Sequence, residues 1–205
     1  MKIGVVGAGG IGGTVGTLWA KAGHEVFFSS RNPEKLTELV TTAGANTQAG
    51  SIAEAAAFGD VIFLSVYYWT TDEAIAACGN IDGKILIDAT NPYLRTDGNI
   101  HRVPGASSGL ELAAKLPQVH VVKAYNTLPT ATFATEHHRA DPYALFYCGD
   151  DPEAKATVDR LITDSGFAGV DIGKLDRVIH QEPGGVLYNH PMLVAEAQKH
   201  LPSLM

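Results

Sequence analysis

The chain has very few cysteines and no long apolar run. Cys78 and Cys148 stand far apart among 205 residues, so we expect neither a disulfide framework nor a cysteine-based metal site. No apolar segment approaches the roughly 18 residues that a membrane-spanning helix needs. Glycines interrupt the apolar start, where a signal peptide would have an unbroken core. The sequence therefore predicts a soluble, cytoplasmic protein without a bound metal.

Basic residues are also scarce. Fifteen lysines and arginines against 22 acidic residues give a net charge of −7. A surface of this sign repels nucleic acid and anionic membranes, so neither is expected as a partner. Any anionic ligand must then be bound by backbone amides or by an arginine placed for it.

Strand-like and helix-like stretches alternate along the chain. Apolar, β-branched or aromatic runs occupy residues 2–6, 25–29, 45–49, 61–66, 84–88, 120–125, 144–148 and 168–172. Capping boxes that start at Ser51, Thr70 and Ser108 predict helices between these runs. The pattern predicts an α/β fold of the Rossmann type. Its doubly wound, mostly parallel sheet carries helices on both faces and a short C-terminal helical segment.

The predicted domain organisation is simple. We expect a Rossmann domain that binds NADP over residues 1–175, and a C-terminal segment over 176–205 whose final helix packs on the same domain. Residues 89–107, rich in proline, glycine and asparagine, are predicted to form a long loop, which is a candidate for function.

A glycine-rich turn follows the first predicted strand. Gly7, Gly9 and Gly12 form the pattern GxGxxG, with Gly10 and Ile11 between them, directly before a helical repeat of apolar residues. The first glycine permits the tight turn, the second lets the backbone approach a pyrophosphate, and the third lets helix and strand pack closely. In this context the motif indicates a dinucleotide site rather than a turn without a ligand.

The residues after the second predicted strand indicate which dinucleotide is bound. An NAD site usually carries a carboxylate there, which binds the ribose hydroxyls. Ser30 and Arg31 stand there instead, and a guanidinium matches phosphate oxygens. Asn32 and Pro33 start a helix just beyond. The alternative is a solvated Arg31 and an Asn32 that only caps the helix. We favour a site for the 2′-phosphate of NADP(H).

Four blocks of sequence resemble a known family. "GVVGAGGIGG", "SSRNPEKL", "LIDATNPY" and "VVKAYNTL" are similar to the coenzyme F420-dependent NADP oxidoreductases, which include the NADPH-binding domain of the STEAP metalloreductases. The resemblance covers most of residues 1–175. It implies that NADPH passes hydride directly to a deazaflavin (F420) or a flavin. It also implies that Val66, Tyr67 and Asn126 lie beside the nicotinamide, and it allows a homodimer.

Two further signals lie at predicted strand ends. Asn91 and Pro92 follow the strand over 84–88, where open α/β sheets bind ligands, although an Asn-Pro turn without a ligand role explains them equally well. For Lys123 we prefer a structural or cofactor-orienting role over a role as proton donor.

Other functions stay open at this point. One is a reductase of a small imine, carbonyl or quinone, and another is a module that binds NADPH and senses redox state without catalysis. In each enzymatic reading the partner is a small-molecule hydride acceptor.

Overall fold

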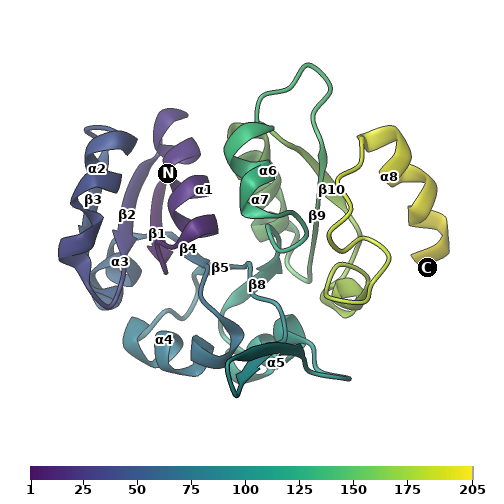
Figure 1. Cartoon of the computed structure of the whole chain (residues 1–205), viewed down its shortest axis with the longest axis horizontal. Coiled ribbons are helices and arrows are strands. Elements are labelled where there is room, and N and C mark those ends of the chain that lie inside the picture. Colours follow the sequence, from purple (N-terminus) through teal and green to yellow (C-terminus); the bar gives the residue numbers. More distant parts are fainter. Residues whose placement is uncertain (205) are drawn as a thin grey trace.

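A computed structural model describes residues 1–204 of the chain (Figure 1). Eight strands form one sheet in the order β10-β9-β8-β5-β4-β1-β2-β3. Their bounds are β1 Lys2–Val6, β2 Glu25–Ser29, β3 Thr47–Gly50, β4 Val61–Leu64, β5 Ile85–Asp88, β8 His120–Lys123, β9 Ala144–Gly149 and β10 Ala168–Asp171. All neighbours are parallel except β8 and β9. The predicted fold class is confirmed.

Helices cover both faces of the sheet. They are α1 Gly10–Lys21, α2 Thr37–Ala43, α3 Ile52–Phe58, α4 Thr71–Cys78, α5 Ser108–Lys115, α6 Thr130–Thr135, α7 Pro152–Asp164 and α8 Val194–His200. Short 3₁₀ turns span Pro33–Leu36, Tyr68–Thr70, Leu175–His180 and Leu201–Leu204. None of the helices described over residues 1–204 is long and apolar enough to cross a bilayer.

Strand residues alternate between two cores because successive side chains point to opposite faces of a sheet. Val61 and Phe63 pack with α1, α2, α6 and α7, whereas Ile62 and Leu64 pack with α3, α4 and α5. The second core also contains residues of the C-terminal part of the chain: Val178, Leu187, Met192 and Ala197. The division into units 1–175 and 176–205 stays a prediction.

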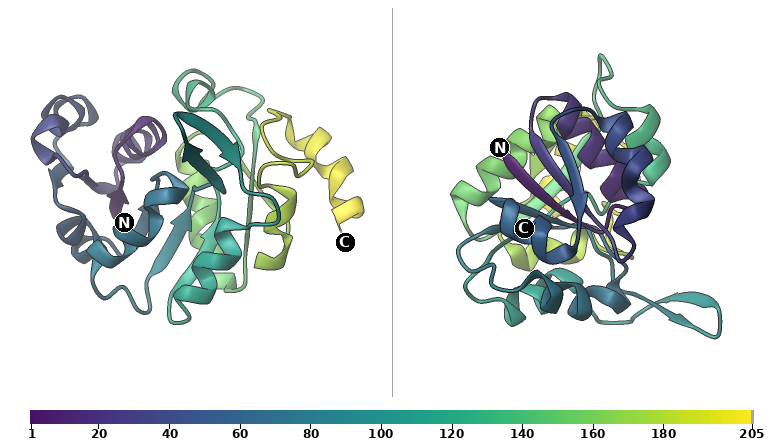
Figure 2. Two further views of the ribbon diagram at one scale, coloured as in Figure 1. Left: turned by 60° about the horizontal axis from the view of Figure 1, so that its bottom comes forward. Right: turned by 90° about the vertical axis from the view of Figure 1, so that its left-hand side faces the viewer.

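The segment 89–107 differs from its prediction as a long loop. It contains a two-stranded antiparallel hairpin, β6 Tyr93–Thr96 and β7 Asn99–Arg102, which turns at Asp97 and Gly98. Both turn residues have positive φ, which suits a tight hairpin turn. The hairpin projects from the body of the molecule as the teal ribbon in the right-hand view of Figure 2.

The capping predictions were partly wrong. The Ser51 hydroxyl and the Glu54 carboxylate form the predicted capping box at the start of α3. The cap of α5 is Ser107 and not Ser108, because the Ser107 side chain accepts the hydrogen bond from the Leu110 amide. The Thr70 hydroxyl donates to the Tyr67 carbonyl instead of capping α4.

Candidate cofactor and substrate site

The glycine turn lies between β1 and α1, and each glycine has its own physical reason. Gly7 has φ +94°, and a Cβ there would lie 2.5 Å from the Ser65 carbonyl oxygen. A Cβ on Gly12 would lie 2.1 Å from the Gly7 carbonyl oxygen. A Cβ on Gly9, in contrast, would meet nothing within 4 Å. Gly7 and Gly12 are therefore required by packing, whereas Gly9 leaves open space beside the backbone that a ligand can occupy.

A cleft of about 780 Å³ opens beside this turn. It lies along the carboxyl ends of β1, β2, β4 and β5, where the strand order reverses between β1 and β4. Nine of the predicted site residues line it: Gly7, Gly9, Gly10, Ile11, Ser30, Arg31, Val66, Tyr67 and Asn91.

Four predicted site residues do not line the cleft. Gly12 is buried in the contact between α1 and β1, and Asn32 is exposed beyond Arg31. Pro92 is buried behind Asn91. Asn126 is only 3% exposed, and it contacts Asn91 rather than the cleft. Gly12, Pro92 and Asn126 are thus buried away from the cleft, whereas Asn32 is exposed beside its Arg31 end.

One end of the cleft carries a positive charge. Arg31 is exposed and lines the cleft directly after β2. The Ser30 hydroxyl oxygen accepts a hydrogen bond from the Asn32 amide at 3.0 Å, so its own O–H can still donate to a ligand. The side chain of Asn32 makes no capping bond to the 3₁₀ turn that follows.

The other end of the cleft is aromatic. The rings of Tyr67 and Trp69 stack at 4.5 Å with an interplanar angle of 5°, and Tyr67 is 65% exposed. The hairpin contributes Tyr93 and Ile100 to the lining, and the C-terminal part of the chain contributes Tyr188. An exposed Tyr67 stacked on a half-buried Trp69 beside an open cleft forms a flat surface on which a planar ligand can pack.

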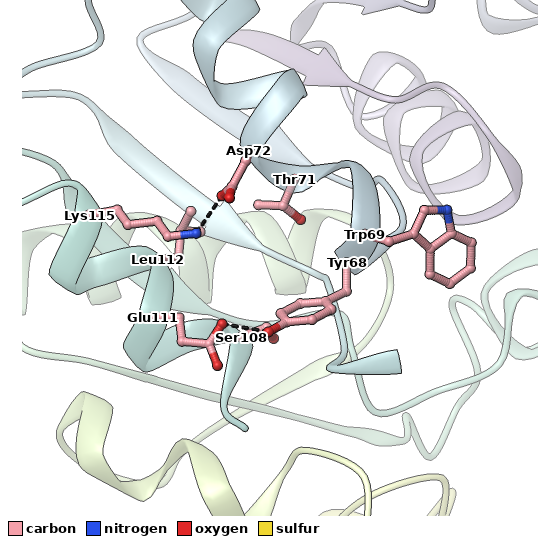
Figure 3. A pocket seen from close by; sticks show the side chains of 8 residues that line it. All are labelled: Tyr68, Trp69, Thr71, Asp72, Ser108, Glu111, Leu112 and Lys115. Carbon is pink, nitrogen blue, oxygen red and sulfur yellow. Dashed lines mark hydrogen bonds and ion pairs between the residues drawn. The ribbon is translucent and has the colours of Figure 1, made fainter. Parts of the chain in front are cut away.

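Tyr68 points away from this aromatic end. Figure 3 shows its ring directed toward α5, where its hydroxyl donates to the Glu111 carboxylate at 2.6 Å, while Trp69 points the other way. Burial and the bond to Glu111 raise the pKa of Tyr68 to about 12. The side pocket between α4 and α5 measures about 190 Å³ and also contains an ion pair of Lys115 and Asp72. Tyr68 therefore stays protonated at neutral pH, and its hydroxyl donates its hydrogen bond to Glu111.

Buried amides support the position of Asn91. The Asn91 amide donates to the Asn126 carbonyl at 2.9 Å, and the Asn126 amide donates to the Asn91 side-chain oxygen at 3.0 Å. The Gln181 side-chain amide donates to the Asn126 side-chain oxygen at 2.9 Å. The backbone carbonyl of Gln181 accepts a hydrogen bond from the Asn126 side-chain amide at 2.6 Å. The wall of the cleft after β5 is thus fixed by residues after β8 and in the C-terminal part of the chain.

Lys123 lies in a closed ionic cluster beneath this wall. Its ammonium group lies 2.8 Å from the Asp88 carboxylate and 3.1 Å from that of Glu182, and it donates to the Ser108 hydroxyl and the Thr90 carbonyl. Lys123 is fully buried and does not line the cleft. The geometry supports a structural role, because no face of the ammonium is directed at the open space.

Sequence reasoning missed several of the residues that form the site. Tyr188 lines the cleft, and Gln181 and Glu182 are buried behind its wall, where they contact Asn126 and Lys123. All three lie in a stretch without a recognisable motif, so no sequence signal singled them out. Ile100 was hidden in the predicted loop. Asp88 did carry a signal, because a carboxylate at the end of an apolar strand often marks the ligand-binding edge of a sheet.

Comparison with known proteins shows what the chain is similar to. Residues 2–92 match the model of a family described as "NADP oxidoreductase coenzyme F420-dependent". Metalloreductase STEAP3 from Rattus norvegicus is 29% identical over 175 residues, which is 85% of this chain but only 34% of that protein. The chain thus spans about a third of the length of this curated relative.

Two solved structures share the fold over most of their length. A hypothetical protein from Sinorhizobium meliloti is 28% identical with a TM-score of 0.84, and the alignment covers 94% of this chain and 95% of that one. A proposed F420-dependent NADP reductase from Arthrobacter is 27% identical with a TM-score of 0.76 and covers 86% of both chains. These matches confirm the predicted resemblance to the coenzyme F420-dependent NADP oxidoreductases.

Proposed function

We propose that the protein is an NADP(H)-dependent oxidoreductase that transfers hydride between NADP(H) and a flat acceptor ring of the deazaflavin (F420) or flavin type. The observation that carries this proposal is the continuity of one cleft. It runs from Arg31 past the open face of Gly9 to the stacked rings of Tyr67 and Trp69. The names of the similar proteins support the same class of reaction.

The residues of the chain fit NADP(H) at the glycine turn. The empty space beside Gly9 allows a pyrophosphate to approach the backbone, and the amides at the start of α1 attract its negative charge. Arg31 and the Ser30 hydroxyl bind the 2′-phosphate at the adenosine end. When bound, NADPH supplies a hydride, and a proton from solvent completes the reduction of the flavin or deazaflavin.

The other residues position the two rings and exclude water. Val66 and Asn91 border the nicotinamide, and the two bonds to Asn126 hold the Asn91 side chain in one orientation. Tyr67 and Trp69 stack on the acceptor. Flavins and deazaflavins delocalise the charge that they receive, so the chain does not have to supply a dedicated acid.

A second candidate is reduction of a small carbonyl, imine or quinone, and one observation favours it. The hydroxyls of Tyr93 and Tyr188 lie 3.5 Å apart at the aromatic end of the cleft. A phenol at this point can donate to the oxygen of a carbonyl substrate. Burial and the bond to Tyr93 raise the pKa of Tyr188, which keeps it protonated.

The two candidates are separated by steady-state oxidation of NADPH with F420, FMN, quinones, ketones and imines as acceptors. We expect turnover with F420 or FMN and little turnover with ketones, and none in a folded Gly9→Val variant. Rapid ketone turnover that is lost in Tyr188→Phe would overturn the leading proposal. Tight NADPH binding without turnover of any acceptor would instead leave a redox-sensing module.

A further inference from the structure

The β6–β7 hairpin presents two arginines on the same face as residues that line the cleft. Its register pairs Tyr93 with Arg102 and Arg95 with Ile100. Cross-strand partners share a face of the ribbon, and so do residues two apart on one strand. Tyr93, Arg95, Ile100 and Arg102 therefore lie on one face. Since Tyr93 and Ile100 line the cleft, this face adjoins it; Arg95 and Arg102 lie beside these two residues, outside the lining itself.

Arg102 is also placed by its contact with the C-terminal part of the chain. A Cβ built on Gly184 would lie 2.1 Å from one guanidinium nitrogen of Arg102, so the guanidinium packs directly over this glycine. Gly184 has φ +91°, and Tyr188, a lining residue of the cleft, follows four positions later. Arg102 thus lies where the hairpin meets the segment that carries Tyr188.

The arginines near the cleft differ from the others in their partners. Arg139, Arg160 and Arg177 each form an ion pair with a neighbouring carboxylate. The remaining three are Arg31, Arg95 and Arg102, and none of them forms an ion pair with any residue in the described part of the chain, 1–204.

In a chain of net charge −7, an arginine without a carboxylate partner is available to an anionic ligand. Arg31 follows β2, whereas the hairpin follows β5, and the two strands are separated by β1 and β4. Three strand spacings place their ends roughly 14 Å apart. One anionic group cannot contact both regions, so the hairpin arginines serve a different group from the one that Arg31 binds.

We propose that Arg95 and Arg102 form a subsite for the anionic tail, a phosphate or carboxylate, of the planar acceptor. This inference rests on the proposed function, because it assigns the acceptor's ring to the Tyr67–Trp69 surface. It narrows the acceptor class to rings that carry such a tail. The planar fork of each guanidinium suits phosphate and carboxylate oxygens.

The test compares ligands that share a ring and differ in the tail. FMN and riboflavin are titrated by flavin fluorescence in the presence of NADP⁺, and F420 is compared with its tail-less deazaflavin core. We expect the wild type to bind FMN about tenfold more tightly than riboflavin, the size of one charge-assisted contact. The difference should shrink in high salt. If the wild type binds F420 more tightly than its core, but binds FMN and riboflavin equally, the subsite binds the longer tail of F420.

The variants are Arg95→Gln, Arg102→Gln and the pair together, with Arg160→Gln as a matched control on the far helix α7. The double variant should lose the preference for FMN while its affinity for riboflavin and NADPH stays unchanged. Arg102→Lys should restore part of the preference. Equal affinity of the wild type for tailed and tail-less ligands, or no binding of either, would overturn the proposal. Weaker NADPH binding in the double variant would also overturn it.

A separate titration of the wild type with NADPH distinguishes the two failures. If NADPH does not bind, the proposed function fails regardless of the flavin results. If NADPH binds and only the preference for a tail is absent, the subsite fails alone.

Discussion

The ammonium group of Lys123 lies 2.8 Å from the carboxylate of Asp88, and neither side chain is accessible to solvent. The other oxygen of Asp88 accepts hydrogen bonds from the amide and the hydroxyl of Thr90, at 2.8 and 2.7 Å. This ion pair therefore shapes the turn after β5, which presents Thr90 and Asn91 to the cleft.

Replacement of Lys123 by methionine should destabilise the protein strongly. The variant leaves Asp88 and Glu182 buried without a counter-charge, which typically costs about 3–5 kcal/mol. Lys115→Met is the matched control, because Lys115 pairs with Asp72 on the surface, where a pair contributes at most about 1 kcal/mol. Denaturant unfolding of both variants measures the difference. Equal losses would show that the buried cluster does not stabilise the fold more than a surface pair.

Arg31 should determine the preference for NADPH. One charge-assisted contact to a phosphate contributes roughly 1.5–3 kcal/mol, so NADPH should bind at least about tenfold more tightly than NADH. Arg31→Ala should remove most of this preference and leave NADH affinity nearly unchanged, as measured by fluorescence titration. Equal affinities for the two nucleotides in the wild type would contradict this role.

Gly9 and Gly12 should respond differently to substitution. Gly9→Val should fold, because the added side chain extends into open space, but it should not bind either nucleotide. Gly12→Ala should lose stability, because its Cβ collides with the Gly7 carbonyl. Thermal unfolding and NADPH titration of both variants test this contrast. Unchanged NADPH affinity in a folded Gly9→Val variant would move the cofactor elsewhere.

Tyr68 should contribute a constant stabilisation through neutral pH. Its folded-state pKa, about 12, is raised above the ordinary value of 10.0. The contribution is therefore complete below about pH 10 and is lost as the pH rises through the folded-state value. Tyr68→Phe should lower the free energy of unfolding by about 1 kcal/mol, equally at about pH 6 and pH 9. A difference that changes within this range would show that Tyr68 titrates earlier.

The parts of the site that local chemistry dictates could be predicted from sequence. The tight turn at Gly7 and the guanidinium of Arg31 follow from residue type and from the distance to a strand, so both were assigned to the cleft before the fold was known. Asn126 was expected beside the nicotinamide but supports Asn91 from behind. A side chain at the end of a strand can point into a cleft or instead form a hydrogen bond with a neighbour. Which of the two occurs depends on partners such as Gln181, which lies 55 residues after Asn126 in the sequence.

Tyr67 was expected beside the nicotinamide, but the arrangement of the rest of the aromatic end of the cleft was beyond sequence reasoning. Tyr93, Ile100 and Tyr188 meet there only because the hairpin and the C-terminal part of the chain lie against each other. The hairpin itself was missed because its strands are exposed on both faces and lack the apolar alternation that marks a strand.

Direct hydride transfer is the central claim, and one isotope measurement tests it. NADPH deuterated at nicotinamide C4 is mixed with F420 and the protein under anaerobic conditions, and the reduced deazaflavin is analysed by mass spectrometry. A deazaflavin keeps the transferred hydrogen on carbon, so the deuterium cannot exchange with water. The account predicts reduced F420 that carries the deuterium, formed in proportion to the NADPH oxidised. Oxidation of NADPH that yields reduced F420 without deuterium from either face of the nicotinamide, or no reduction of F420 or of any flavin, would contradict it.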